Sequence, residues 1–340
     1  MAMRVVPNAA AAQLTRDRVA LLGTQVDRVP RDAIDAWITA FIESGQPHQV
    51  VTANLDFIAV ARKRPPFAKV IAEAALVVCD GKPLQWAARL QGSPIPARVT
   101  GMDLVLHAAK LSAARGYRLF LLGAAPDVAE RAALELLKLF PGCEIAGTYS
   151  PPKGEFSPAE NARMVEMVRA ARTDALFVAL GAPKQDEWIK AHLEELQVPL
   201  CAGIGGVFNF LAGETRRAPV WMQQAGFEWA FRLMQEPSRL WRRYLINDLP
   251  IFFELFMGQL ANRSAGTTPR PVAAAPLDTE MLAALELLDR PRSGIAQATT
   301  PLRRFGAQRV RARRRSLGSA GRIRRPMLAR AALRSPSRVS

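Results

Sequence analysis

Short apolar, β-rich runs alternate with longer amphipathic segments through the middle of this 340-residue chain. The amphipathic segments open on Pro, Asp or Ser, residue types that favour the first turn of a helix. A strand, helix, strand repeat of this length predicts a parallel sheet with helices on its faces. The expected strands are RLFLLG at 118–123, CEIAGTY at 143–149, ALFVALG at 175–181 and PLCAGIG at 199–205, with helices over 126–140, 157–172 and 183–196.

The first half of the chain repeats this pattern less regularly. Buried strands are expected at QVVTAN (49–54) and LVVCDG (76–81), with helices near 31–44, 57–74, 82–91 and 101–115. The fold class predicted for the body is therefore α/β. Neither G-x-G-x-x-G nor G-x-x-x-x-G-K-[ST] occurs in the sequence, which argues against a dinucleotide dehydrogenase and a P-loop enzyme.

The positive charge of the chain is concentrated at its end. The formal net charge is +16, and residues 263–340 contain 17 Lys and Arg against 4 Asp and Glu. The remaining residues are nearly balanced, so the high isoelectric point does not indicate a nucleic-acid-binding body. The Ala, Pro, Thr, Ser and Arg bias of 263–340 predicts a mostly disordered, basic tail with room for a short helix at 278–289.

Cysteine and histidine usage indicates neither disulfides nor a bound metal. Cys79, Cys143 and Cys201 are far apart and form no Cys-x-x-Cys pair, which favours a reducing, cytoplasmic setting. The three histidines have no partner at ligand spacing, and Asp-x-Asp is absent. No apolar run approaches the ~18 to 20 residues that span a bilayer, so any membrane contact is expected to be peripheral.

Polar residues follow the expected strands at the edge where ligands bind in open parallel sheets. Thr52 and Asn54 end one strand, Asp80 follows the next, and Gly181 opens the loop after a third. A partly buried carboxylate at the position of Asp80 can accept a proton from an attacking hydroxyl group. The alternative is that Asp80 simply caps the helix that follows it.

The segment 218–262 is rich in Trp and Arg and is expected to be helical. Arg232, Arg239, Arg242 and Arg243 are spaced so that one continuous helix would place them on one face. Guanidinium groups beside aromatic and apolar residues suit a phosphate held at a membrane interface. The alternative is an amphipathic helix that packs on the body and leaves its basic face in solvent.

Six segments in this order resemble the WecG/TagA/CpsF glycosyltransferases. The segments are TANLDF (52–57), CDGKPLQW (79–86), RVTGMDL (98–104), GAPKQDEW (181–188), GIGGVFNFLAG (203–213) and the Arg- and Trp-rich stretch at 216–244. The resemblance covers about residues 18–250 and excludes the tail. It implies a Rossmann-like parallel sheet flanked by helices, in the distinct fold of that family. The expected parts are a core at 1–217, a membrane-facing helical appendage at 218–262 and the tail at 263–340.

The resemblance also implies an activity. Members of the family transfer a hexose or N-acetylhexosamine, with inversion, from a UDP-sugar to a polyprenyl-diphosphate-linked sugar of bacterial cell-surface polysaccharides. They need no metal or other cofactor, and they work at the anionic inner face of the plasma membrane. Homo-oligomerisation is left open, as is the choice between an N-acetylmannosamine-type donor and glucose, and nucleic acid is not an expected partner.

The family's site residues carry over to matching positions of this chain. Asp80 matches the catalytic base, with Thr52 as the second catalytic residue, and Asn54 belongs to the same motif as Thr52. Donor or substrate contacts are expected from four residues, Asn54, Arg98, Gln185 and Gly181. Lipid-diphosphate contacts are expected from Arg232, Arg239 and Arg242. A different class of protein also fits the composition, namely a non-catalytic α/β binding protein tethered to membrane or nucleic acid by its basic tail.

Overall fold

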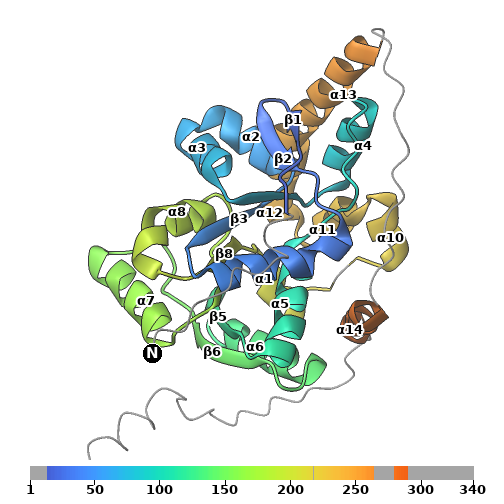
Figure 1. Cartoon of the computed structure of the whole chain (residues 1–340). Coiled ribbons are helices and arrows are strands. Elements are labelled where there is room, and N and C mark those ends of the chain that lie inside the picture. Colours follow the sequence, from blue (N-terminus) through green and yellow to red (C-terminus); the bar gives the residue numbers. More distant parts are fainter. Residues whose placement is uncertain (1–13, 217, 264–278, 290–340) are drawn as a thin grey trace, which may run out of the picture. The chain divides into compact units, whose positions relative to one another are not determined.

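The apolar runs form the strands of a six-stranded sheet at the centre of the computed structural model, which describes residues 14–216, 218–263 and 279–289 (Figure 1). Neighbouring strands all run parallel, in the order β4-β3-β8-β7-β5-β6. The strands are β3 (His48–Ala53), β4 (Leu76–Cys79), β5 (Arg118–Gly123), β6 (Glu144–Tyr149), β7 (Ala175–Ala179) and β8 (Leu200–Gly203). The predicted α/β fold with a parallel sheet is confirmed.

Helices cover both faces of this sheet, as parallel sheets require. In β5, Leu119 and Leu121 point into one layer of the core, whereas Phe120 and Leu122 point into the other. One layer contains α1 (Ile34–Ser44), α5 (Gly101–Arg115), α6 (Val128–Leu139) and α9 (Val207–Leu211). The other contains α2 (Leu55–Lys63), α3 (Pro65–Glu73), α4 (Lys82–Leu90), α7 (Pro158–Ala170) and α8 (Lys184–Leu196).

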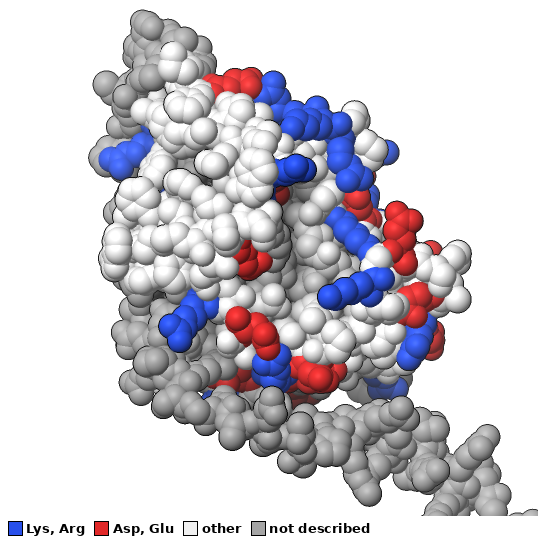
Figure 2. Space-filling view, turned by 180° about the vertical axis from the view of Figure 1, so that it is seen from behind, with Lys and Arg blue, Asp and Glu red and all other residues white. Residues whose placement is uncertain are grey.

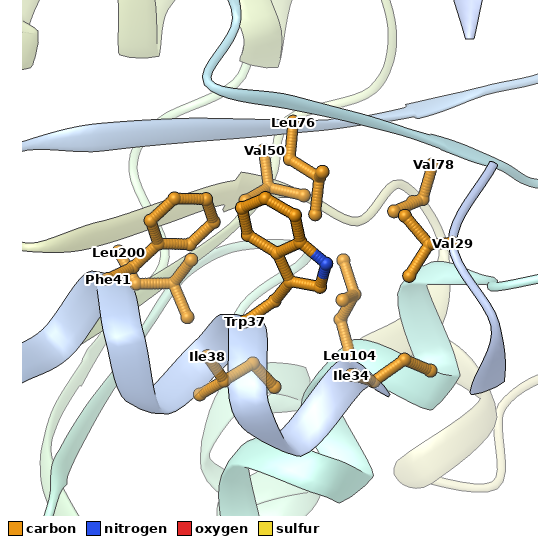
Figure 3. Close-up of a pocket in the computed structure, with 10 residues that line it drawn as sticks. All are labelled: Val29, Ile34, Trp37, Ile38, Phe41, Val50, Leu76, Val78, Leu104 and Leu200. Carbon is orange, nitrogen blue, oxygen red and sulfur yellow. The ribbon is translucent and has the colours of Figure 1, made fainter. Parts of the chain in front are cut away.

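Figure 3 shows how α1 packs on the sheet. The side chains of Trp37 and Phe41 lie against Val50 of β3 and Leu76 of β4. The gap between them measures about 10 Å³ and has an apolar lining. Because a buried water needs at least two polar partners, this gap is a packing defect and not a binding site.

An antiparallel hairpin that the sequence did not predict precedes α1. β1 (Arg18–Leu21) and β2 (Thr24–Asp27) are joined by Leu22 and Gly23, which both have positive φ, 47° and 83°. Such two-residue turns usually contain Asn-Gly or Asp-Gly, and Leu22 gives no such signal. The buried Asp27 fixes the hairpin to the sheet, because its carboxylate accepts hydrogen bonds from Arg16 and from the backbone N–H of Val77 at 2.7 Å.

The expected helix at 57–74 is two helices in the structure. α2 ends at Lys63 and α3 begins at Pro65, with Arg64 between them in a non-helical conformation. Proline at the start of a helix is favourable, but it excludes the helical conformation from the residue before it. The Pro65-Pro66 pair therefore divides this stretch.

The segment after residue 218 is helical, as predicted, but it is not continuous. It comprises α10 (Val220–Ala225), α11 (Glu228–Gln235), α12 (Pro237–Trp241), the π-helix η3 (Arg242–Asp248) and α13 (Leu249–Arg263). The break between α11 and α12 lies at Glu236, whose φ and ψ of −130° and 60° precede a proline. Near the expected short helix, α14 (Thr279–Asp289) forms, and the rest of the predicted disordered tail lies outside the described residues.

Candidate active site

Asp80 lies at the carboxyl edge of the sheet, directly after β4. Its backbone N–H donates to the carbonyl of Ala53 at 2.7 Å, which ties it to the end of β3. On the other side of β4, the N–H of Val99 donates to the carbonyl of Cys79 at 2.8 Å and brings the loop before α5 alongside. The Asp80 side chain is half-buried at the meeting point of these three segments.

The surroundings of Asp80 make its carboxylate more basic than an ordinary aspartate. Burial raises the pKa of Asp80 to about 6. The Arg98 guanidinium opposes this rise in pKa most strongly, and the Glu228 carboxylate adds to it. More weakly, Arg232 lowers the pKa of Asp80 and Asp103 raises it. Asp80 is therefore ionised at neutral pH while its proton affinity lies near the operating range of a general base.

Arg98 is held beside Asp80 by a network of ion pairs. Its guanidinium contacts the Glu228 carboxylate of α11 at 2.9 Å, and the two side chains are only 15% and 22% exposed. The Arg98 carbonyl accepts a hydrogen bond from Arg31 at 2.7 Å, and Arg31 also pairs with the buried Asp103 at 2.9 Å. Asp103 in turn forms a capping box with Thr100 that begins α5. Burial lowers the pKa of Arg98, but the nearby carboxylates outweigh burial and raise this pKa above its ordinary value.

Thr52 and Gln185 meet at the neighbouring end of β8. The Thr52 hydroxyl donates to the carbonyl of Gly203 at 3.2 Å, and the Gln185 side-chain oxygen accepts from the N–H of Gly205 at 3.0 Å. A Cβ atom on Gly203 would lie 2.6 Å from the Gln185 amide nitrogen, so this position requires glycine. Both side chains are almost fully buried, and they pack beneath the carboxyl ends of β3 and β8.

Asn54 and Gly181 have local structural roles at the same edge. Asn54 caps α2, because its side-chain oxygen accepts a hydrogen bond from the N–H of Phe57 at 3.2 Å. Gly181 has a φ of +80°, and no described atom lies within 4 Å of the place where its Cβ would be. Gly181 is exposed, so its place in the loop after β7 is set by its backbone conformation and not by crowding.

The appendage arginines do not share one face, which corrects the arrangement expected from a continuous helix. Arg232 of α11 lies 4.9 Å from the ring centre of Phe210 and 3.8 Å from Glu228, so it faces the candidate site. Arg242 is exposed and stacks on Trp241, and Arg243 instead pairs with Asp56 of α2 at 3.2 Å. The side chain of the fourth arginine, at position 239, lies outside what the structure describes.

The appendage carries many exposed apolar side chains. Figure 2 shows a face of the molecule where charged side chains border a hollow beside a broad area with few charges. The exposed large side chains of the appendage are Trp221, Phe227, Trp229, Met234, Trp241, Leu245, Ile246, Leu249, Phe253 and Met257.

Ile251 and Leu255 of α13 instead pack into the core, so α13 is also part of the fold. Every helix in the described ranges is too short or too polar to cross a bilayer.

Two residues that the sequence did not single out complete the site. Glu228 is the partner of Arg98, and its only sequence signal is an acid one turn before Arg232 in an Arg- and Trp-rich segment. Asp186 is fully buried beside Gln185, and burial raises its pKa to about 7. Among the described residues neither carboxyl oxygen of Asp186 accepts a hydrogen bond of normal geometry. A buried, poorly solvated acid next to Gln185 could not be distinguished in the sequence from an ordinary first-turn aspartate.

The neighbouring thiol of Cys79 is not a nucleophile in this setting. Burial raises the pKa of Cys79 to about 12, so the thiol stays protonated near neutral pH. Within residues 14–216, 218–263 and 279–289, no three His, Cys, Asp or Glu side chains are grouped to hold a metal ion. Asp80 differs from the fully buried Asp186 in being half-buried, so a ligand at the strand ends could reach its carboxylate.

The described structure combines a parallel α/β core, a carboxylate with a raised pKa at the strand ends and an arginine-bearing appendage. The sequence model described as "Glycosyl transferase WecG/TagA/CpsF family" matches residues 19–265, and the chain belongs to this family. The resemblance seen in the sequence motifs is thereby confirmed. The assignment of individual site residues to catalytic and binding roles stays a prediction.

Curated relatives from Staphylococcus aureus are similar to this chain. Proteins of strains MW2, NCTC 8325 and MRSA252 are each 28% identical over 203 residues, which is 60% of this chain and 77% of theirs. All three are named N-acetylglucosaminyldiphosphoundecaprenol N-acetyl-beta-D-mannosaminyltransferase. Their names describe transfer of N-acetylmannosamine to a lipid-diphosphate-linked N-acetylglucosamine.

Proposed function

We propose that the chain is an inverting glycosyltransferase that moves a hexose or N-acetylhexosamine from a UDP-sugar to a polyprenyl-diphosphate-linked sugar. Family membership supports a glycosyltransferase, and the names of the relatives support N-acetylmannosamine as the sugar and a GlcNAc-diphosphate lipid as the acceptor. The observation that carries the proposal is the family match over residues 19–265, and the place of Asp80, half-buried at the carboxyl edge of the sheet, supports it. The expected role is in bacterial cell-surface polysaccharide synthesis.

The proposed reaction is a single displacement. Asp80 accepts the proton of the acceptor hydroxyl while that oxygen attacks the anomeric carbon of the donor sugar. The bond from the anomeric carbon to the UDP oxygen breaks on the opposite face, so the stereochemistry inverts. The hydroxyl must come within about 2.6 to 3.2 Å of the Asp80 carboxylate for this transfer.

Cationic side chains are proposed to stabilise the UDP leaving group in place of a metal. Arg98 and Arg232 come from two different parts of the chain, and the charges of both lower the pKa of Asp80. Guanidinium groups bind phosphate oxygens in a bidentate manner and keep their charge at all relevant pH values. Arg239 and Arg242 are proposed to reach the acceptor diphosphate from the appendage.

The appendage is proposed to hold the enzyme on the anionic inner face of the plasma membrane. Its exposed Trp side chains and the neighbouring Arg242 form the mixed aromatic and basic surface that suits a lipid headgroup layer. A long lipid acceptor can then reach the strand ends from the membrane without leaving it. Location in the cytoplasm, peripheral to the membrane, is part of this proposal.

The test is acceptor-dependent UDP release by the full chain. The substrates are a panel of UDP-sugars and short-chain polyprenyl-diphosphate GlcNAc or glucose, with product identified by mass spectrometry. Release with one donor and one acceptor, with inverted stereochemistry in the product, is the expected result. A folded protein that binds no UDP and forms no product with any pair would refute the proposal.

A further inference from the structure

A carboxylate from the appendage reaches into the candidate site. Glu228 begins α11, and its carboxylate lies 2.9 Å from the Arg98 guanidinium and 3.8 Å from Arg232 on the next turn. The Arg98 side chain is 130 residues away in sequence and comes from the loop that pairs with β4. The contact therefore joins the appendage to the segment that holds Asp80.

We propose that Glu228 is a positioning residue of the transfer reaction, which holds the Arg98 guanidinium near Asp80 and balances its charge there. The inference rests on the proposed function, because Glu228 would act, through Arg98, on Asp80 as the base of the transfer reaction. The appendage would then help to arrange the catalytic residues, in addition to any contact with lipid.

The positioning argument rests on the geometry of Arg98. A long guanidinium side chain has many conformations, and an ion pair that is largely shielded from water selects one of them. The backbone of Arg98 is fixed separately, because its carbonyl accepts from Arg31. Glu228 therefore positions the guanidinium group of Arg98, while Arg31 positions its backbone carbonyl.

The electrostatic argument concerns the charges around Asp80. Without Glu228, the positive charge of Arg98 would be less compensated, so it would lower the pKa of the Asp80 carboxylate further and weaken it as a base. The carboxylate of Glu228 balances that charge and itself raises the pKa of Asp80. The other charged groups that act on this cluster are Arg31, Lys82, Asp103 and Arg232.

The deciding experiment is the pH dependence of Glu228→Gln in the full chain. Glutamine keeps an oxygen that can accept from Arg98 but removes the charge, so the acid limb of kcat/KM should move to lower pH. The rate on the plateau should fall about tenfold, since a hydrogen bond to a neutral group is weaker than one to a charged group. Glu228→Ala also removes the acceptor and should lower the rate by about 100-fold.

Glu254→Gln is the matched control. Glu254 also lies on the appendage and also pairs with an arginine of the body, Arg62, but it is not among the charges that shift the pKa of Asp80. This control should keep the wild-type acid limb and rate. A uniform loss of rate in Glu228→Gln with an unmoved acid limb would overturn the proposal, as would a gain in rate, which would mean that Glu228 competes with substrate for Arg98.

A second readout needs no substrate. In protein labelled with ¹³C at aspartate carboxyls, the Asp80 signal can be assigned from its absence in Asp80→Asn and titrated with and without Glu228→Gln. A lower Asp80 pKa in the variant is expected, and an unchanged titration refutes the proposal even in an active enzyme. A folded wild-type protein that binds no UDP and transfers no sugar would instead refute the proposed function, so the two failures are distinguishable.

Discussion

Replacing Asp80 by Asn is expected to change activity and stability in opposite directions. The side chain keeps its size at the end of β4 but loses the group that accepts the proton. General-base contributions are typically 10²- to 10⁴-fold, so transfer should slow by about 100-fold or more, equivalent to ~3 kcal/mol or more of barrier. Binding of UDP should be retained, because the arginines are unchanged.

The stability effect follows from the raised pKa. With a pKa of about 6 in the folded protein and an ordinary value of 3.8, the folded state binds more protons between these limits than the unfolded state. Stability therefore falls as pH rises from about 4 to about 6, and the ionised carboxylate destabilises the fold by up to ~3 kcal/mol above that range. Asn does not titrate, so Asp80→Asn should be more stable than wild type at pH 8, and this advantage should shrink towards pH 4.

The assay is UDP release together with denaturant unfolding of the full chain at about pH 4.5 and pH 8. Asp17→Asn is the control, because Asp17 is an exposed partner of Arg28 and its loss should change stability by no more than ~0.5 kcal/mol. Near-normal turnover by Asp80→Asn with a verified acceptor would refute the base assignment. A variant that is less stable than wild type at pH 8 would refute the account of the pKa.

Three further substitutions test the surroundings of the site. Gly203→Ala should destabilise the fold by ~1 to 3 kcal/mol in thermal unfolding, because the new Cβ would lie 2.5 Å from the Asp186 carboxylate. Gly206→Ala is the control and should be near neutral, because its Cβ would meet no described atom within 4 Å. Asp186→Asn should raise the free energy of unfolding by ~2 to 4 kcal/mol above pH 7 but by little near pH 4, because burial raises the pKa of Asp186 to about 7 in the folded protein. An equal gain in stability at both pH values would contradict this prediction. Arg243→Ala should cost ~1 to 3 kcal/mol in denaturant unfolding by leaving the buried Asp56 without its cation, and an unchanged midpoint would show that the pair is not structural.

The strands and the position of Asp80 could be predicted because both follow from local pattern. An apolar run that ends in a polar residue and glycine, as at 76–81, predicts a buried parallel strand. It also predicts that the polar residue, Asp80, lies at the carboxyl edge of the sheet. The hairpin at 18–27 could not be predicted, because Leu22 adopts positive φ without a sequence signal for it. The division of 57–74 into two helices follows from Pro65-Pro66, which interrupts a stretch whose apolar pattern is otherwise helical.

The contacts of the site depend on tertiary packing and lie beyond local pattern. Nothing in the sequence pairs Arg98 with Glu228, because their contact depends on how the appendage docks on the sheet. The same packing turns Gln185 inward to Gly205 and brings Arg243 to α2 instead of to the other arginines. Residue types and strand ends thus predict where a site lies, while three-dimensional packing decides which groups are free to meet a ligand.

The charges of the site are arranged so that a substrate diphosphate would strengthen the base. Three carboxylates at positions 80, 103 and 228 lie among four cations at positions 31, 82, 98 and 232, so the cluster has a small excess of positive charge before substrate binds. A bound UDP diphosphate would draw on Arg98 and Arg232, whose positive charge lowers the pKa of Asp80, and it would add negative charge nearby. Both effects raise the proton affinity of Asp80. The carboxylate would therefore become most basic when the donor is in place, which is the state in which the acceptor hydroxyl must lose its proton.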